Sequence, residues 1–425
     1  MEAVSRDRMT DKARELSRRE YFQMLVATGG MAALSACLDE QESTETQAVP
    51  QGDPAKRPAR QHAWNAVLGE DEHGNLRPPA HRVLVPLNLV TDPNEDDSAT
   101  VESAFRSLES AYAYDSEGLL FTVGYTPSYF ETVGAESPIP APTALTSDED
   151  PAFDSFDAMV HLASNRPDVV LEAEEALLGA VSAPNDVEME ATLDGIFQRG
   201  EPRRTGFVGP GLPKSKGKAV GGVPDELPED APFFMGFKSG FAESQASEDR
   251  VTVASGPYEG GTTTHVESLT VQLKTWFEQD NHFQRVAKLF SPEHASDELV
   301  GNIGEKLGTS TGVAGDIAQQ TSTDARNEGV IGHAQKAARA REDGEPLLLR
   351  RDFNTVDGDR PGVHFLSHQQ TIADFVRTRK AMAGGALAGN GVGQNHGNGI
   401  LQYIFVRRRG NFLVPPRDMR ALPAI

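Results

Sequence analysis

One thiol in the sequence is placed where it could do chemistry. Cys37 is the only cysteine among 425 residues, and it follows the run Leu-Ser-Ala at 34–36, which ends an apolar stretch beginning at Tyr21. A single thiol excludes an intramolecular disulfide and any metal cluster that needs several thiolates. As a thiolate it is a good nucleophile, and the small residues before it leave room for a peptidase. Cys37 is therefore a candidate for lipid attachment, and a buried structural cysteine is the alternative.

The segment before Cys37 has the features of an export signal. Arg18 and Arg19 form a twin-arginine pair. The apolar stretch that follows is about 16 residues long, short of the roughly 20 that a membrane-spanning helix needs. The pattern resembles a Tat signal ending in a lipobox, with residues 1–36 removed. We therefore expect export by Tat and a lipid anchor at Cys37 on the outer face of the cytoplasmic membrane.

The composition indicates a strongly acidic globular protein. The chain has 63 Asp and Glu against 40 Lys and Arg, which gives a formal net charge of -23. Such a balance argues against nucleic-acid binding, because no excess of Lys and Arg is left to neutralise phosphates. The acidity resembles that of halophilic proteins, with an ordinary acidic surface as the alternative. The length and the 38% hydrophobic content suggest about two or three domains.

Hydrophobic periodicity predicts the elements that must position any site. Residues 37–75 are polar and lack periodicity over most of their length, so we expect a flexible tether there. The next segments alternate between strand-like and helix-like patterns. In chain order they are strand 82–90, helix 101–112, strand 119–125, strand 158–163, helix 167–179 and a last strand within 191–207. The order βαββαβ predicts a ferredoxin-like domain over residues 76–215.

The second half repeats this order less clearly. Its expected elements are strand 269–273, helix 276–290, strands 347–349 and 363–366, helix 372–382 and strand 400–406. The Gly- and Asn-rich stretch 384–399 indicates a surface loop. We therefore expect a second ferredoxin-like domain over residues 216–425, and an α+β fold of two tandem ferredoxin-like units.

Several motifs in this frame resemble those of dye-decolourising (DyP-type) haem peroxidases. The run from Val123 to Phe130 is similar to the family's GFGPSLF turn, and the run from Gly256 to Thr262 to its GGTY segment. The match is collinear from about residue 82 to 416. The resemblance implies the family's dimeric α+β barrel-like architecture, haem b in the second unit, and the assembly of identical chains into an oligomer. It implies hydrogen peroxide and an electron donor as partners.

The resemblance also assigns an iron ligand. Gly332, His333 and Ala334 begin a segment that aligns with the family's proximal haem segment. His333 is therefore the expected axial ligand of the haem iron. One neutral imidazole can carry haem iron and leave its opposite face open for peroxide. His364 and His368 fall in an expected core strand and are interpreted as packing or pocket-lining groups.

The distal side is implied in the same way, with one departure. Arg351 aligns with the family's distal arginine, with Arg350 as the fallback. The family's GFxDG motif aligns with Gly236, Phe237 and the run to Gly240, which are expected at the cofactor. Ser239 stands where the acid-base aspartate belongs, and a hydroxyl cannot act as a carboxylate base at pH 7.

Two functions follow from this departure. The first is an exported haem protein that reduces hydrogen peroxide and oxidises an organic donor or a metal ion. In it, Arg351 stabilises the leaving oxygen and Ser239 lines the pocket. Asp352 or Glu243 could supply the missing carboxylate. The second is a lipid-anchored haem-binding or haem-handling protein with little peroxidase turnover.

Overall fold

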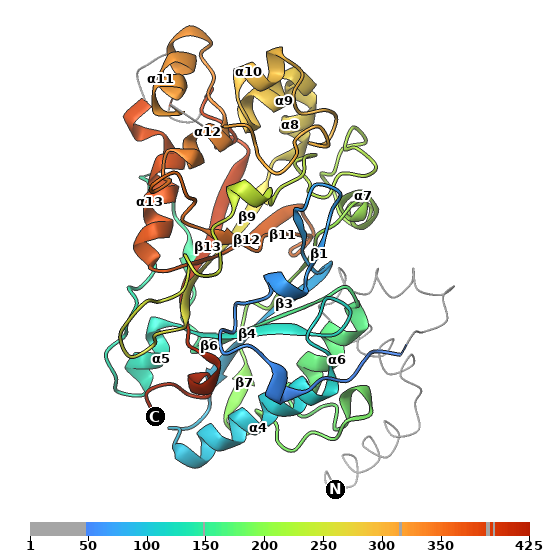
Figure 1. Ribbon diagram of the computed structural model, residues 1–425, viewed down its shortest axis with the longest axis vertical. Helices are drawn as coiled ribbons and strands as arrows, with labels where there is room; N and C mark the ends of the chain where they lie inside the picture. Colours follow the sequence, from blue (N-terminus) through green and yellow to red (C-terminus); the bar gives the residue numbers. More distant parts are fainter. Residues whose placement is uncertain (1–47, 148, 314–316, 388–391, 394–395) are drawn as a thin grey trace, which may run out of the picture. The chain divides into compact units, whose positions relative to one another are not determined.

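The computed structural model describes residues 48–425 except 148, 314–316, 388–391 and 394–395 (Figure 1). The predicted signal over residues 1–36 and the candidate lipidation site Cys37 lie outside the described residues. No helix in the described part of the chain is long and apolar enough to cross a membrane.

The first half forms the predicted βαββαβ unit. Its elements are β3 (His81–Leu89), α4 (Glu95–Ala111), β4 (Leu120–Tyr125), β6 (Ala158–Ser164), α6 (Pro167–Leu177) and β8 (Arg204–Phe207). The strands pair in the order β8-β3-β6-β4, and each pair is antiparallel. The Asn94 side chain caps α4 together with Asp97, which explains why the helix starts there. Helix α6 packs on β3 and β6, and α4 packs on α6.

The second half repeats the same topology. Its elements are β9 (Thr262–Val271), β10 (Leu349–Arg350), β11 (Phe353–Thr355), β12 (Gly362–Gln369), α13 (Ile372–Ala383) and β13 (Ile404–Val414). Strand β9 lies between β13 and β12, and β12 pairs with both β10 and β11, again antiparallel. The order β13-β9-β12-β11 therefore corresponds to β8-β3-β6-β4 of the first half.

A run of helices is inserted in the first crossover of the second half. They are α8 (Leu273–Gln279), α9 (His282–Leu289), α10 (Pro292–Ser296), α11 (Ile317–Asn327) and α12 (His333–Ala338). Figure 1 shows them gathered at the top of the view, beyond the ends of β9 and β13. The sequence pattern predicted one long helix over 276–290, whereas α8 ends at Gln279 and α9 begins at His282 after a capping Asn281.

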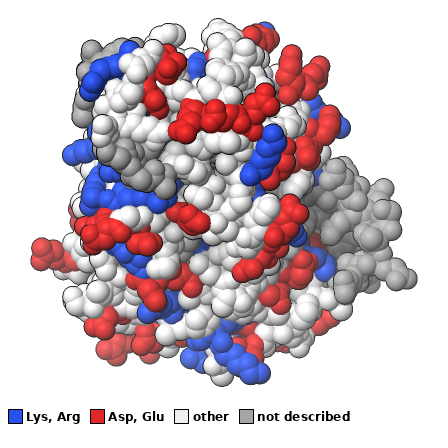
Figure 2. All heavy atoms as spheres, turned by 45° about the horizontal axis from the view of Figure 1, so that its top comes forward, with Lys and Arg blue, Asp and Glu red and all other residues white. Residues whose placement is uncertain are grey.

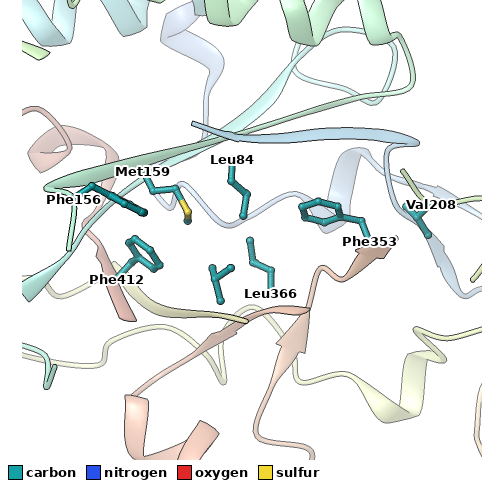
Figure 3. Packing of buried hydrophobic residues seen from close by; sticks show 8 residues of the cluster. Leu84, Phe156, Met159, Val208, Phe353, Leu366 and Phe412 are labelled. Atoms are coloured by element: carbon teal, nitrogen blue, oxygen red, sulfur yellow. The ribbon is translucent and has the colours of Figure 1, made fainter. Parts of the chain in front are cut away.

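The two units close on each other through backbone pairing. Asn354 of β11 pairs with Phe207 of β8, and Leu413 of β13 pairs with Tyr125 of β4. The expected units over residues 76–215 and 216–425 are thus joined at both edges, so neither edge is left open. A buried cluster fills the space between their strands (Figure 3), with Leu84 and Met159 opposite Leu366 and Phe412.

The chain before the first unit is folded, which corrects part of the tether prediction. Residues 48–75 contain η2 (Pro54–Lys56), η3 (Asn65–Val67) and β1 (Gly69–Glu70), which pairs with β2 (Leu76–Arg77). Trp64 is fully buried with Leu68, Leu120 and Ala163. Burial of a tryptophan offsets the ordering entropy of the surrounding polar chain, and a search for periodicity misses a single large anchor.

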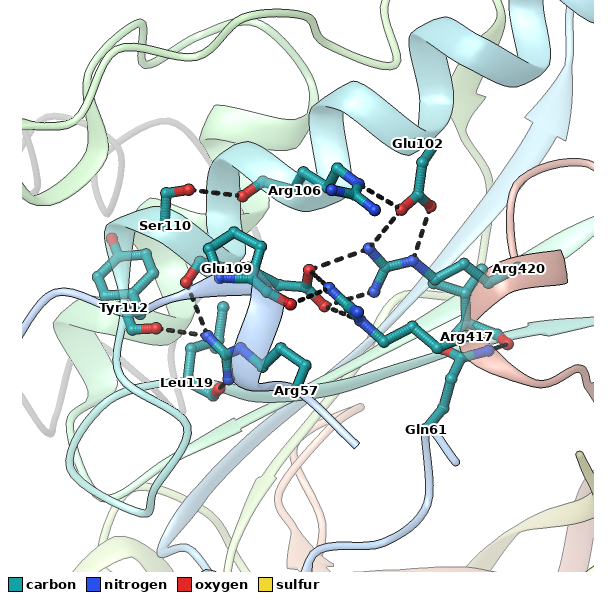
Figure 4. A network of polar contacts seen from close by, with 12 residues as sticks. Arg57, Gln61, Glu102, Arg106, Glu109, Ser110, Tyr112, Leu119, Arg417 and Arg420 are labelled. Atoms are coloured by element: carbon teal, nitrogen blue, oxygen red, sulfur yellow. Dashed lines mark hydrogen bonds and ion pairs between the residues drawn. The ribbon is translucent and has the colours of Figure 1, made fainter. Parts of the chain in front are cut away.

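The last residues of the chain are held on α4 by a buried ionic network (Figure 4). Arg420 donates to Glu109 Oε1 over 2.6 Å and to Glu102 Oε2 over 3.0 Å, and Arg417 also pairs with Glu109. Burial alone would raise the pKa of Glu109, but the hydrogen bonds and charges of the two arginines lower it. The network joins residues more than 300 positions apart in sequence.

The remaining short elements connect these parts. They are α5 (Pro127–Thr132), β5 (Ala152–Phe153), η4 (Pro184–Asp186), β7 (Phe197–Arg199), α7 (Leu212–Gly217), η5 (Ala242–Ser244), η6 (Gly385–Leu387) and η7 (Arg417–Met419). Figure 2 shows acidic side chains spread over the visible face and interspersed with fewer basic ones, in agreement with the formal charge of -23.

Candidate functional site

A large cavity lies in the second half of the described chain. Its volume is about 1230 Å³, above the roughly 300–1,000 Å³ that is common for small-molecule sites. Its apolar wall comes from β9, β12, β13 and α13, from the inserted helices, from the segment before β9, and from Leu145 of the first half. These side chains include Phe237, Leu269, Val271, Phe290, Phe365, Phe375, Ile404 and Val406. Such a wall suits a large, mainly apolar ligand.

His333 lines this cavity from the first position of α12. The helix begins there because Gly332 allows a close approach: a Cβ at Gly332 would lie 1.6 Å from the carbonyl oxygen of Phe290. Gln335 accepts a hydrogen bond from Gly332 N over 2.8 Å and donates to Asp324 over 2.7 Å. These contacts fix the first turn of α12 and with it the backbone of His333.

The imidazole of His333 is neutral near pH 7. Burial and, to a smaller extent, the positive charges of Lys336, Arg350 and Arg379 together lower its pKa to about 3. Its Nδ1 is buried and has no hydrogen-bond partner among the described residues. A neutral imidazole is the form that binds a metal. The structure therefore places His333, which the resemblance assigned as the iron ligand, in the cavity wall.

Arg350 and Ser239 meet at the same cavity. Both side chains line it, and Arg350 Nη1 donates to Ser239 Oγ over 3.3 Å. Asp352 also lines the cavity, with its Oδ2 3.6 Å from Arg350 Nη1. Burial raises the pKa of Asp352, although Arg350 and Arg82 act in the opposite direction. A cation, a hydroxyl and a buried carboxyl group are thus combined beside the space that a ligand would occupy.

Arg351 is a correction to the predicted site. It does not line the cavity: its Nη2 donates to Asn65 Oδ1 over 2.6 Å, and it lies 3.8 Å from Glu248 and over the ring of Trp64. Arg350 ends β10, and Arg351 and Asp352 connect it to β11; Arg350 and Asp352 line the cavity, whereas Arg351 does not. Of the two arginines considered for the distal role, the fallback residue Arg350 is therefore the one that lines the cavity.

The predicted motif 236–240 lies in the wall, with a division of roles. Phe237 and Ser239 line the cavity, as does Lys238 between them. Gly236 and Gly240 do not line it; their φ angles are 87° and 80°, a backbone conformation that favours glycine. These two glycines shape the segment instead of contacting a ligand, which corrects their prediction as cofactor-binding residues.

Other candidates from the sequence lie elsewhere. Glu243 is exposed, accepts a hydrogen bond from Thr309 over 2.8 Å and does not line the cavity, so of the two candidate carboxyl groups only Asp352 reaches it. His364 and His368 are buried packing residues outside the cavity wall, in contact with Ser268 and Thr264 respectively.

Sequence reasoning missed Lys336 and Arg379. Lys336 is fully buried and donates to Asn398 O over 2.8 Å and to its Oδ1 over 2.7 Å. Burial and, to a smaller extent, the positive charge of Arg379 together lower the pKa of Lys336 to about 7. Arg379 lines the cavity and pairs with Glu149. The only available signal was helical spacing, which puts residue 336 one turn from His333.

Comparison with solved structures defines the class of fold. The chain is similar to a dye-decolorizing peroxidase (DyP) from Bacteroides thetaiotaomicron, with a TM-score of 0.53 and 13% identity over 84% of this chain and 98% of the other. It is also similar to a DyP-type peroxidase from Cellulomonas bogoriensis, with a TM-score of 0.53 and 17% identity over 82% and 93% of the two chains. At these identities the likeness shows the α+β ferredoxin-like fold of DyP-type peroxidases.

A further structural relative was solved with its cofactor. It is a DypB variant from Rhodococcus jostii RHA1 in complex with heme, with a TM-score of 0.50 and 15% identity over 85% of this chain and 98% of the other. In sequence, a family model matches residues 79–416, and the chain belongs to this family of unknown function, DUF7405. A search of curated proteins found no match.

Proposed function

We propose that this protein binds haem b in the cavity and uses it to reduce hydrogen peroxide while oxidising an organic donor or a metal ion. One observation carries the proposal: a neutral imidazole, His333, lies in the wall of a cavity of about 1230 Å³ that is otherwise largely apolar. The DyP-type fold supports it.

The residues present fit a haem. His333 would bind the iron, and the apolar side chains from β9, β12 and β13 would contact the flat ring. Arg350 and Arg379 would offset negative charge on the ligand, since both line the cavity. The haem would supply the redox chemistry, and the protein supplies position and electrostatics.

The distal roles pass to residues other than the expected pair. The guanidinium group of Arg350 offers several hydrogen-bond donors and can stabilise negative charge that develops on a peroxide oxygen. Asp352 is the cavity carboxyl group whose pKa is raised by burial, so it can hold or move a proton closer to neutral pH than an exposed aspartate can. Ser239 can orient a water or a peroxide through its hydroxyl.

The test is an absorbance titration of the purified protein with hemin, followed by hydrogen peroxide. We expect a Soret band with one hemin per chain and a shift of that band on adding peroxide. His333→Ala should lose the band, while the exposed His73→Ala should keep it. Absence of a band in the wild-type protein, or its persistence in His333→Ala, would contradict the proposal.

A second function, haem binding with little turnover, is favoured by two observations. Ser239 replaces the acid-base aspartate, and His333 Nδ1 has no hydrogen-bond acceptor among the described residues. Metal-binding histidines almost always donate their second N–H to an acceptor that raises their basicity.

Ser239→Asp separates the two functions. A large gain, up to the 10²–10⁴-fold that a general base typically contributes, would support the low-turnover function. An already active wild type with little gain would support the peroxidase.

The export route remains part of the proposal. Arg18, Arg19 and Cys37 support Tat export and a lipid anchor. The measurement is the distribution of the protein between membrane and soluble fractions of the producing cells. We expect Cys37→Ser to move it to the soluble fraction and Arg18→Lys with Arg19→Lys to retain the unprocessed precursor. Unchanged fractionation of both variants would contradict the anchor and the route.

A further inference from the structure

The hairpin of β1 and β2 lies before residue 79, where the match to the family begins, yet it contacts the cavity wall. Asp71 follows β1 and forms an ion pair with Lys238, which lines the cavity. The side chains of the pair are only 13% and 25% exposed. Burial alone would raise the pKa of Asp71, but hydrogen bonds from Lys238 and Asn75 lower it, so Asp71 is ionised near neutral pH.

Asn75 makes a second connection from the same hairpin. Its side chain is 2% exposed, and its Oδ1 accepts a hydrogen bond from Ala242 N over 2.8 Å. Its Nδ2 donates to Gly308 O over 3.0 Å. One buried amide thus joins the end of segment 236–242 to the loop that leads to Thr311 and Val313 of the cavity wall. An amide group this deeply buried fixes the positions of the segments that it joins, because leaving one of its buried hydrogen-bond partners unpaired would cost free energy.

The turn of the hairpin is closed by hydrogen bonds within the hairpin itself. Asp71 Oδ1 accepts hydrogen bonds from His73 N and Asn75 N, each over 2.9 Å, which closes the turn on its own side chain. The chain just before it is anchored by Trp64, which is fully buried. The positions of Asp71 and Asn75 are therefore set independently of the segment that they hold.

We propose that Asp71 and Asn75 are positioning residues for the cavity: they hold segment 236–242, with Lys238 and Ser239, at the distance that a bound ligand requires. The part that concerns the ligand rests on the proposed haem function. The positioning itself does not, because it can be measured on the protein without hemin.

The first measurement is hydrogen–deuterium exchange of the purified protein without added hemin. Asp71→Asn and Asn75→Ala should each raise exchange in peptides that cover residues 236–243. Asp71→Asn keeps the oxygen that closes the turn and removes only the charge. Glu72→Gln is the matched control, because Glu72 is an exposed neighbour whose one ion pair is with His73 over 3.7 Å. Exchange equal to that of Glu72→Gln in both variants would overturn the proposal.

The second measurement is hemin affinity from Soret titration, with the melting temperature as a check on the fold. We expect Asp71→Asn to raise the dissociation constant about three- to tenfold, since the lost pair is charge-assisted but partly exposed. In a Lys238→Met background the same substitution should have little further effect, because Asp71 acts through Lys238. If the two substitutions change the hemin dissociation constant additively, Asp71 does not act on the ligand through Lys238. If Asp71→Asn raises exchange but leaves hemin affinity unchanged, the link between positioning and the ligand is overturned. If the wild type binds no hemin while exchange responds as expected, the haem function fails and the positioning role stands.

Discussion

The two halves of the molecule share one topology but differ in what joins their first two strands. In the first half the connection runs from residue 90 to 119 and contains one long helix, α4. In the second it runs from residue 272 to 348 and contains α8 to α12. In the first half α6 lies directly on the sheet, whereas in the second half the inserted helices and the sheet together line a cavity of about 1230 Å³.

The difference shows how a repeated fold acquires a single site. The strands of both halves supply apolar faces, and a helix laid directly on such a face fills it with core. The longer connection places His333 and Phe290 across from the face of β9 and β12 and leaves space between them. Charged groups serve both purposes: Glu109 of the first half is held in ion pairs by Arg417 and Arg420 of the second, whereas Arg350 and Asp352 of the second half face the cavity.

The largest expected effect is the loss of hemin binding when His333, the proposed iron ligand in the second half, is removed. His333→Ala should weaken hemin binding by more than about 100-fold, since even removal of a ligand's hydrogen-bond partner costs about 10–100-fold in metal affinity. The free energy of unfolding without hemin should change little. Soret titration and urea unfolding measure the two quantities. Equal hemin affinity in the variant would remove the functional distinction between the halves.

The second prediction distinguishes the two neighbouring arginines. Arg350→Gln should lower peroxide-dependent donor oxidation about 100-fold, as expected when one positioned donor to a developing anion is lost. Arg351→Gln should instead lower the free energy of unfolding by about 1–3 kcal/mol, because it removes the hydrogen bond to Asn65 and the ion pair with Glu248, both half-buried. Steady-state kinetics and urea unfolding of both variants test this. The reverse outcome would return the distal role to Arg351.

The third prediction concerns the packing of the first half. Trp64→Ala should lower the free energy of unfolding by about 3–5 kcal/mol, because it empties a fully buried site beside Leu68 and Leu120. Phe283→Ala is the control: its side chain is 52% exposed, and its effect should stay within about 0.5 kcal/mol. Equal effects in urea unfolding would mean that residues 48–75 are not an integral part of the fold.

The smallest expected effect is a pH dependence of the free energy of unfolding that arises from Glu267 on β9. Burial alone would raise the pKa of Glu267, but His265, Arg409 and Arg379 lower it from its ordinary value of 4.5 to about 2. The pKa is lower in the folded state, so the stabilisation is complete above about pH 4.5 and is lost as the pH falls toward 2. Urea unfolding between pH 5 and 3 should show a shallower decline for Glu267→Gln than for wild type. The exposed Glu259→Gln should follow wild type.

Local patterns predicted much of the fold for identifiable reasons. Alternation and helical spacing gave the strands and helices of the first unit, because each buries one face against one layer. The insertion was harder to predict: α10 and α12 are short, and their ends depend on caps and close contacts such as Gly332 against Phe290. Residues 48–75 were misassigned because one buried tryptophan, not a periodic pattern, orders them.

The sequence by itself determined the order βαββαβ in the first half and the acidic charge, and its resemblance to DyP-type peroxidases assigned the candidate ligand His333. The same resemblance named Arg351 as the distal arginine, with Arg350 as the fallback. Only the tertiary structure decided which of the two reaches the cavity, because a strand's pattern does not say which of two apolar sides encloses a ligand. It likewise decided that Asp71, far from Lys238 in sequence, supports the cavity wall, since such pairings arise only when distant segments pack together.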